Sequence, residues 1–395
     1  MSRNPNDAVI VSVARTALAR SPKGALRATR PDDFAAVAIL AALSRVEGLD
    51  ISEIDDVILG CASPEAAQGL NVARIAALRA GLPETVPGLT LNRFCASGIE
   101  AIAVAAAKIA TGQATLIVAG GVESMTMVPF MGPTLSPNPY LIEHSPDTYM
   151  PMGLSVERLA KRYGITREAS DQYSLESHRR AIAAQDAGYF AAEIAPVTPE
   201  PTDESAGSAG GAPVFDRDEG PRRDSTLESL AKLRPAFSED GVITAGNASP
   251  RSDGAAAVIV TSRAVAEEHG WHPLARFAGY ALAAVTPADF GIAPAHAIPK
   301  LLERARVSLK DIDLIEFNEA FAAQVLAANR IYPLPMDRVN VNGGAVALGH
   351  PLGATGARQT ATMVLEARRR GARFGIVTMC AALGMGAAAL LEFES

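Results

Sequence analysis

The feature that most constrains the fold of this chain is a long internal repeat. Strand and helix patterns alternate in the first half, at residues 54–59, 66–80, 86–91, 98–109 and 116–119. The same order returns near the C-terminus, at residues 312–317, 320–330, 339–342, 356–367 and 374–379. Any two α/β segments share some likeness, but here both the order of elements and several residue types agree. The repeat therefore predicts two related α/β halves packed together rather than a solenoid.

The segment between the halves breaks this alternation. It carries helical patterns at 155–163 and 169–187, and residues 199–220 are rich in Pro, Ser, Gly, Ala and acids without periodicity, which is typical of an exposed loop. We therefore expect an N-terminal half at 1–120, an inserted loop domain at 121–250 and a C-terminal half at 251–395. Residues 251–270 are expected to complete the sheet of the N-terminal half. Insertions of this kind commonly cover a substrate.

Composition excludes several classes of function. The net charge of −7 argues against nucleic acid as the main partner, although a local basic patch for a phosphorylated ligand remains compatible with it. The 3 cysteines lie far apart, so free thiols in a reducing compartment are expected. The sequence shows no signal peptide and no apolar run long enough to span a bilayer, so we expect no membrane association and a cytoplasmic location.

The most informative cysteine is Cys95, in Asn92-Arg93-Phe94-Cys95-Ala96-Ser97-Gly98. Ser97 and Glu100 have the spacing of a capping box, so a helix is expected to begin near Ser97. This would place the Cys95 sulfur at the positive end of a helix dipole, which favours the nucleophilic thiolate. The alternative is a small buried apolar side chain, and this stretch alone does not decide between the two.

Three further stretches carry polar groups of catalytic type. His350 lies in the glycine-rich run 340–356, at the place in its half that Cys95 occupies in the other; a two-fold relation would bring the two together as a Cys–His pair. Cys380 follows a buried strand beside small residues, which suits an acid or base that approaches carbon closely. Asn318 stands at a strand–helix junction, where its amide can serve an oxyanion or hold a water. The structural alternatives are a hydrogen-bonded turn histidine, a core cysteine and a helix N-cap.

These four stretches together resemble one family, the thiolases. The stretch around Cys95 is similar to the nucleophile motif, and Asn318-Glu319-Ala320-Phe321, Gly349-His350-Pro351 and the Cys380 stretch are similar to the other catalytic motifs, in the same order. The resemblance implies a five-layered αβαβα fold built from two duplicated halves, with an inserted loop domain that covers coenzyme A. It implies reversible thiolytic cleavage of 3-oxoacyl-CoA to acetyl-CoA and a shortened acyl-CoA through acyl-Cys95, as in the β-oxidation of fatty acids.

The resemblance also implies a role for each residue. Cys95 would carry the acyl group, His350 would activate Cys95 and bind the thioester oxygen, and Cys380 would be the acid or base. Asn318 would hold a water that completes one oxyanion hole with His350, and the backbone amides of Cys95 and Ala382 would form the other. The implied contacts of coenzyme A are Arg222, Ser229, Phe237, Ala245 and Ser249. The implied lining of the acyl pocket is Met152 and Phe321.

The resemblance implies no cofactor besides coenzyme A as a substrate, and no metal: His350 and Cys380 fall short of a closed zinc site. Acyl-CoA and coenzyme A would be the ligands of a homodimer or homotetramer, and the sequence identifies no β-oxidation partner subunit. The chain departs from many thiolases at Ala382 and Leu383, where glycines are usual. Pro151 before Met152 resembles the degradative type, whereas acetoacetyl-CoA thiolases often carry a histidine there.

Several alternatives remain at this point. The nearest is a thiolase specific for acetoacetyl-CoA. A ketoacyl synthase would need His or Asn in place of Cys380, and a cysteine hydrolase would not need Cys380 at all. The alternative from a different class is a catalytically idle relative that binds acyl-CoA or lipid, which is expected to have lost Cys95, His350 or Cys380.

Overall fold

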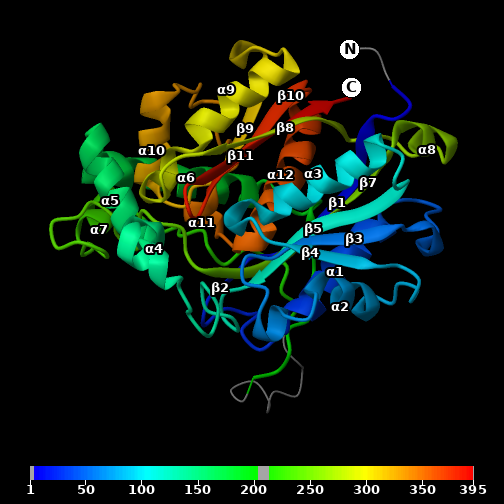
Figure 1. The fold of residues 1–395 in the computed structure, drawn as a ribbon, viewed down its shortest axis with the longest axis horizontal. Coiled ribbons are helices and arrows are strands. Elements are labelled where there is room, and N and C mark those ends of the chain that lie inside the picture. The colour runs from blue at the N-terminus through cyan, green and yellow to red at the C-terminus, as the bar shows by residue number, and fades with distance from the viewer. Residues whose placement is uncertain (1–3, 203–212, 395) are drawn as a thin grey trace.

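The computed structural model describes residues 4–202 and 213–394 (Figure 1). The strands form one sheet path in the order β4-β3-β5-β7-β1-β8-β11-β10-β9, with β2 and β6 attached to β7 and β1. The strands are β1 (Ala8–Thr16), β2 (Ala19–Arg20), β3 (Asp56–Gly60), β4 (Gly88–Leu91), β5 (Leu116–Ser124), β6 (Ile194–Ala195), β7 (Ser252–Ser262), β8 (Ala275–Ala284), β9 (Leu314–Phe317), β10 (Phe374–Ala381) and β11 (Met385–Phe393).

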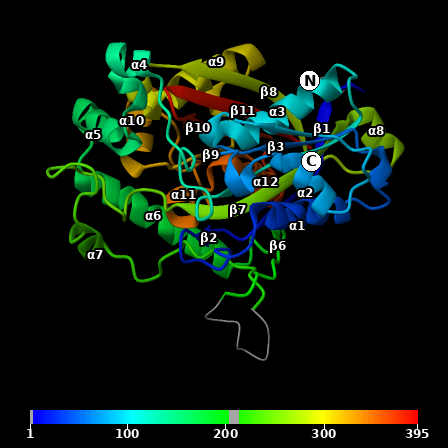
Figure 2. The same ribbon diagram turned by 60° about the horizontal axis from the view of Figure 1, so that its bottom comes forward.

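The helices lie on and between two parts of this sheet (Figures 1 and 2). They are α1 (Pro31–Ser44), α2 (Val72–Arg79), α3 (Ser97–Ala110), α4 (Pro139–His144), α5 (Met152–Tyr163), α6 (Arg167–Asp186), α7 (Leu227–Ala231), α8 (Arg263–Glu268), α9 (Pro294–Ala305), α10 (Ala322–Ile331), α11 (Ala345–Leu348) and α12 (Thr355–Arg370). The predicted helical pieces at 155–163 and 169–187 correspond to α5 and α6.

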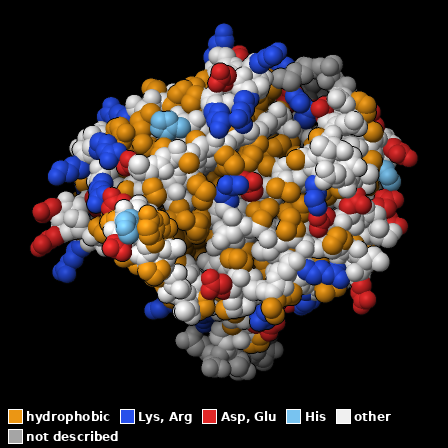
Figure 3. Space-filling view, viewed as in Figure 1, with side chains coloured by type: hydrophobic (Ala, Val, Ile, Leu, Met, Phe, Trp, Pro, Cys, Tyr) orange, Lys and Arg blue, Asp and Glu red, His pale blue; other side chains and the backbone are white. Residues whose placement is uncertain are grey.

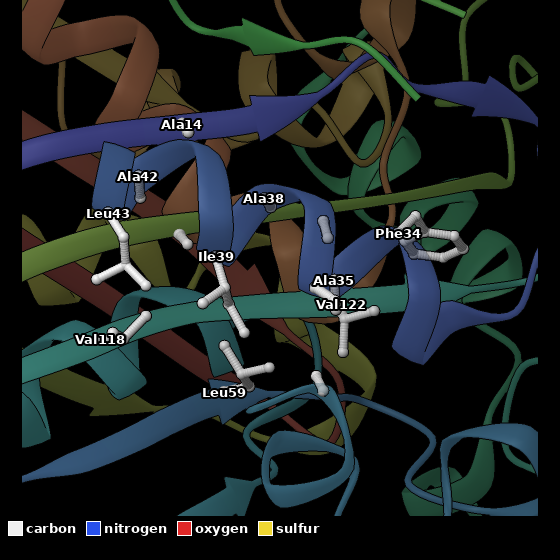
Figure 4. Close-up of a cluster of buried hydrophobic side chains, with 14 of the residues drawn as sticks. Ala14, Phe34, Ala35, Ala38, Ile39, Ala42, Leu43, Leu59, Val118 and Val122 are labelled. Atoms are coloured by element: carbon white, nitrogen blue, oxygen red, sulfur yellow. The ribbon is translucent and has the colours of Figure 1, made fainter. Parts of the chain in front are cut away.

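Three apolar clusters define five layers. One packs α1 and α2 against β1, β3, β5 and β7, and Figure 4 shows Leu43 of α1 above Val118 of β5 and Ile39 of α1 pointing toward Leu59 of β3. A second surrounds α3 and α12 with side chains of both parts of the sheet, and a third packs α9 and α10 against β8 to β11. The two parts of the sheet meet only where Val9 and Ile10 of β1 pair with β8. The expected αβαβα architecture is therefore present.

The central layer depends on close contact between α3 and α12. A Cβ on Gly98 would lie 2.7 Å from the Gly353 carbonyl oxygen, and one on Gly356 would lie 2.4 Å from the Ile99 nitrogen. Both distances are below any real Cβ contact, so these two positions require glycine. The contact brings together the N-terminal ends of both helices, and these ends carry the loops of Cys95 and His350.

The structure differs from the expected elements between residues 66 and 80. The helix expected at 66–80 is a 3-10 turn, Ala66–Gln68, followed by α2, because Leu70 and Asn71 adopt positive φ and the Asn71 side chain accepts the N–H of Arg74 at the start of α2. In the predicted loop 199–220, residues 203–212 lie outside the described part of the chain.

Residues 251–270, which are expected to complete the sheet of the N-terminal half, include β7, and β7 lies between β5 and β1 in that sheet. The division into three domains stays a prediction.

Candidate active site

Three loops converge at the carboxyl end of β10. Cys95 lies in the 3-10 turn Phe94–Ala96 that precedes α3, and His350 lies between α11 and the turn that precedes α12. Leu352, two residues after His350, packs in one apolar cluster with Cys95. Cys380 is near the end of β10, and its thiol is close enough to Cys95 for the two to influence each other's ionisation. Two segments that are 255 residues apart in the sequence thus form one buried site.

The Cys95 thiol is buried and faces two backbone donors. The backbone N–H groups of Cys95 itself and of Ala382 are near enough to lower the pKa of this thiol. Burial nevertheless raises the pKa of Cys95 to about 12, and the charge of Glu123 acts in the same direction. The expectation that the helix dipole makes Cys95 a thiolate is therefore wrong for the unliganded protein, because desolvation of the sulfur outweighs the dipole. The Cys95 thiol can therefore act as a nucleophile only after a nearby base has taken its proton.

The expected capping box at the start of α3 is also wrong. The helix does begin at Ser97, but the Ser97 hydroxyl accepts the N–H of Arg93 (2.8 Å) and donates to the carbonyl of Phe94 (2.7 Å). Glu100 instead forms an ion pair with the Arg93 side chain and accepts the hydroxyl of Tyr280 (2.6 Å). Both side chains therefore stabilise the loop that carries Cys95, residues 92–96, and do not cap the helix.

His350 is a neutral imidazole with a defined tautomer. The Thr355 hydroxyl donates to the carbonyl of Pro351 (2.9 Å), so its oxygen is left to accept the Nδ1–H of His350 (2.6 Å). The proton therefore lies on Nδ1, and Nε2 carries the lone pair. Burial, assisted by the charge of Arg358, lowers the pKa of His350 to about 3. Nε2 is thus available as a base.

Asn318 faces the same nitrogen. Its Nδ2 lies 3.2 Å from His350 Nε2, and its Oδ1 is buried without a hydrogen-bond partner among the described residues. Its backbone N–H donates to Thr378 of the neighbouring strand β10, which fixes its place (2.9 Å). A buried amide oxygen without a partner is expected to bind a water or a ligand group, so the expectation that Asn318 holds a water is consistent with this geometry.

Cys380 and the turn after it complete the site. Burial and the neighbouring Cys95 raise the pKa of Cys380, so it is a protonated thiol and can act as an acid. Ala382 has an ordinary φ, which allows a residue with a Cβ at a donor position that is usually glycine. Leu383 takes the left-handed conformation (φ +63°) of the three-residue loop between β10 and β11.

Glu123 was missed by the sequence reasoning. Its buried carboxylate accepts the N–H groups of Ala62 and Gly353 (2.8 Å each), and also bonds Ser63 and Gln68. It thereby ties the loop before α12 to the end of β3. The available signal was an acid near the end of the strand Leu116–Ser124, whose first seven residues are all apolar or glycine.

The expected contacts of coenzyme A fall into two groups. Arg222, Ser229 and Ala245 line one cavity of about 330 Å³. Closer to the thiols, the Phe237 ring lies 6.1 Å from the Phe321 ring in a T-shaped contact, and the Ser249 hydroxyl donates to Ala320 (3.1 Å). Met152 and Phe321, the expected acyl lining, pack in one apolar cluster with Cys380.

The described residues lack two features, a metal-binding cluster and a membrane-spanning helix. No group of three or more His, Cys, Asp or Glu side chains could hold a metal ion. No helix within residues 4–202 and 213–394 is long and apolar enough to cross a membrane.

Comparisons with known proteins place this geometry in context. Residues 8–264 match the family described as "Thiolase, N-terminal domain", and residues 271–393 match "Thiolase, C-terminal domain". The chain is 47% identical to the 3-ketoacyl-CoA thiolase of Bacillus subtilis, over 98% of this chain and 99% of that protein. The acetyl-CoA acetyltransferase of Bacillus anthracis superposes with a TM-score of 0.90 at 41% identity, covering 98% of this chain and 99% of that one. Human mitochondrial 3-ketoacyl-CoA thiolase in complex with CoA superposes with a TM-score of 0.88 at 37% identity, covering 99% of this chain and 98% of that one.

Proposed function

The chain belongs to the thiolase family, and from this premise we propose that it catalyses the reversible cleavage of 3-oxoacyl-CoA by coenzyme A. The products are acetyl-CoA and an acyl-CoA shortened by two carbons. The observation that carries this proposal is the convergence of two thiols and one neutral imidazole around backbone donors that face the Cys95 sulfur. Human mitochondrial 3-ketoacyl-CoA thiolase has been solved with CoA bound, which supports coenzyme A as a ligand here.

The first half-reaction transfers the acyl group to Cys95. His350 Nε2 accepts the thiol proton, and the sulfur attacks the 3-oxo carbon. The oxygen of that carbon gains negative charge and is stabilised by the amide N–H groups of Cys95 and Ala382, which already face the sulfur. The bond between carbons 2 and 3 then breaks, and its electron pair remains on the departing acetyl-CoA as an enolate.

The enolate is stabilised and protonated on the other side of the site. The imidazolium of His350 now carries a proton on Nε2 and donates it as a hydrogen bond to the enolate oxygen, with Asn318 and a bound water beside it. The Cys380 thiol gives its proton to carbon 2, which releases acetyl-CoA. In the second half-reaction, the thiol of a second coenzyme A gives its proton to the Cys380 thiolate, and its sulfur takes the acyl group from Cys95. The Cys95 sulfur leaves as a thiolate and regains its proton from the His350 imidazolium, which restores all three groups. Coenzyme A is the only cosubstrate that this scheme requires.

We place the substrate range above four carbons, as in fatty-acid β-oxidation. Pro151 precedes Met152 at the start of α5, and Met152 packs with Phe321 and Cys380 in one apolar cluster. An apolar side chain at these positions, in place of a histidine donor, favours the binding of an alkyl chain. The alternative is a thiolase restricted to acetoacetyl-CoA. The similarity of this chain to the Bacillus anthracis acetyl-CoA acetyltransferase supports that alternative.

The deciding experiment is a chain-length profile of coenzyme A-dependent cleavage, read as loss of the enolate absorbance. We expect cleavage across substrates longer than four carbons, and none with Cys95→Ala. Cys380→Ala is expected to become acylated at Cys95, seen by mass spectrometry, but not to turn over. Activity on the four-carbon substrate alone would establish the acetoacetyl-CoA type. Binding of coenzyme A without cleavage at any length would instead favour a catalytically idle relative.

We also propose that the protein is a homodimer that pairs through β4. This strand ends the sheet path and pairs only with β3 among the described strands, so its other edge is open. Leu89 on β4 is 40% exposed, and Figure 3 shows apolar side chains gathered over the face that carries β4, α3 and β11. Light scattering should give the mass of two chains, and Leu89→Lys should shift it toward one. A tetramer mass for the unchanged protein would correct this proposal.

A further inference from the structure

A basic cavity lies at the far end of the predicted path of coenzyme A. It has a volume of about 330 Å³, and three separate parts of the chain line it. Arg222 and Ser229 come from the insertion, His178 comes from α6, and Arg20 comes from β2 in the N-terminal half. Arg20 is not among the residues that the sequence motifs identify, so its presence here is new.

The two arginines of this cavity have uncommitted guanidinium groups. Among the described residues, no hydrogen bond involves the guanidinium groups of Arg20 and Arg222. Their backbone N–H groups donate to Glu219 (2.8 Å) and to His178 (3.2 Å), and the Arg20 carbonyl accepts the N–H of Gly24 (2.6 Å). The next residue, Arg223, is different, because both of its terminal nitrogens bond the carboxylate of Asp186. Arg20 and Arg222 thus offer free donors to the cavity, whereas Arg223 does not.

The charges around Arg20 favour an anion. Burial and the charge of Arg222 lower the pKa of Arg20, and Glu219 and Asp224 oppose this effect. Glu219 is already engaged by two backbone N–H groups, those of Arg20 and Ala25. Asp224 also lines the cavity, so the cavity itself keeps an excess of one positive charge. Two neighbouring guanidinium groups repel each other unless an anion lies between them.

His178 adds a neutral donor to the same cavity. It is buried, and its Nδ1 accepts the backbone N–H of Arg222. Burial, with the charges of Arg222 and Arg20, lowers the pKa of His178 to about 4. The ring is therefore neutral at physiological pH, with its proton on Nε2, and it can donate a hydrogen bond without adding charge.

The segment that lines one side of the cavity also contacts the site of the thiols. Ala245 and Pro250 line the cavity, and Ala248 lies between them in the sequence. Ala248 pairs with Phe321 in an isolated bridge, and Phe321 packs in one cluster with Cys380. A long thioester can therefore place its anionic end in the cavity and its acyl end at the thiols.

We propose that Arg20, together with Arg222, binds a phosphate group of the 3′-phospho-ADP part of coenzyme A and makes the enzyme selective for that carrier over pantetheine. This inference rests on the proposed function, because it concerns the acceptor of the same reaction. Coenzyme A has two anionic groups of this chemistry, the pyrophosphate and the 3′-phosphate, and Arg20 acts on one of them.

The test compares three acceptor thiols at a fixed, saturating concentration of 3-oxoacyl-CoA: coenzyme A, dephospho-CoA and pantetheine. Arg20→Met is expected to raise the KM for coenzyme A about 10-fold to 100-fold, the range for loss of a charge-assisted hydrogen bond, with kcat within about 2-fold. The KM for pantetheine should not change, because pantetheine has no phosphate. Arg223→Met is the matched control and should leave every KM unchanged. Arg20→Lys, which keeps the charge, should restore most of the affinity.

The acceptors also separate the two phosphate sources. If Arg20→Met leaves the KM for dephospho-CoA unchanged, Arg20 binds the 3′-phosphate; if that KM rises as it does for coenzyme A, Arg20 binds the pyrophosphate. An equal rise for pantetheine, or an equal effect of Arg223→Met, would overturn the inference. Calorimetric titration of both variants with coenzyme A measures the same contact without turnover. If the unchanged protein cleaves no substrate, the proposed function is refuted. Calorimetry then still tests this inference, which requires weaker binding of coenzyme A by Arg20→Met than by Arg223→Met.

Discussion

Thr355 is predicted to control the chemistry of His350 without touching the substrate. Its hydroxyl oxygen accepts the Nδ1–H of His350 at 2.6 Å while its own proton goes to Pro351 at 2.9 Å. Thr355→Val keeps the shape of the side chain but removes the acceptor and leaves a buried N–H without a partner. Such a loss costs about 1–3 kcal/mol. If this whole cost raises the activation free energy, kcat falls about 5-fold to 150-fold, since about 1.4 kcal/mol corresponds to a tenfold change in rate.

The assay is coenzyme A-dependent cleavage, with kcat and KM determined separately for Thr355→Val and Thr355→Ser. Serine keeps the hydroxyl, so Thr355→Ser should retain most of kcat, and neither variant should change the KM for coenzyme A by more than about 2-fold, because the residue lies away from the cavity of Arg222. The ¹⁵N chemical shifts of His350 should report the loss of the single tautomer in Thr355→Val alone. Equal kcat for the valine variant and the unchanged protein would refute the argument, and so would an equal loss in both variants.

Three further predictions concern other parts of the structure. Asn318→Ala removes the amide beside His350 Nε2 and should lower kcat by about 10² to 10³, the effect of losing one oxyanion donor, with a smaller change in KM. The pKa of His350 is about 3 in the folded chain and about 6.5 when unfolded, so its contribution to stability is present above pH 6.5 and is lost as the pH falls toward 3. From pH 7 to pH 5 the unchanged protein should therefore lose about 2 kcal/mol more unfolding free energy than His350→Gln, measured with urea; identical pH dependence would contradict burial of a neutral ring. Leu70 is 93% exposed with φ +54°, so Leu70→Gly should stabilise by about 1 kcal/mol in thermal or urea unfolding, whereas Leu70→Ala should not.

The order of strand and helix patterns along the sequence predicted most of the architecture. Alternating strand and helix patterns and their return in the C-terminal half predicted two α/β halves, and the structure has this arrangement around α3 and α12. Local chemistry was less well predicted. The helix after Cys95 begins at Ser97 as expected, but Ser97 and Glu100 bond the nucleophile loop instead of capping it. Spacing identifies which residues can meet, and competing partners from distant segments decide which of them do.

The residues of the candidate site were predictable by type, and their states were not. Cys95, His350, Cys380 and Asn318 stand in stretches that the sequence alone marks as unusual, and the fold brings those stretches together. The protonation state of Cys95 was predicted with the wrong sign, because a helix dipole can be read from the sequence whereas full burial of the sulfur cannot. Glu123 was missed for the same reason: its role consists of contacts with loops 60 and 230 residues away.

The sequence by itself determined the kind of protein this is: an α/β chain with an internal repeat, two separated thiols and a histidine in glycine-rich surroundings. Only the tertiary structure decided that the His350 proton lies on Nδ1, that both thiols are protonated, and that Arg20 joins Arg222 around one cavity. The physical reason is that ionisation and tautomer depend on desolvation and on hydrogen-bond partners supplied by distant segments. These quantities take a value only when the whole chain has folded around the group.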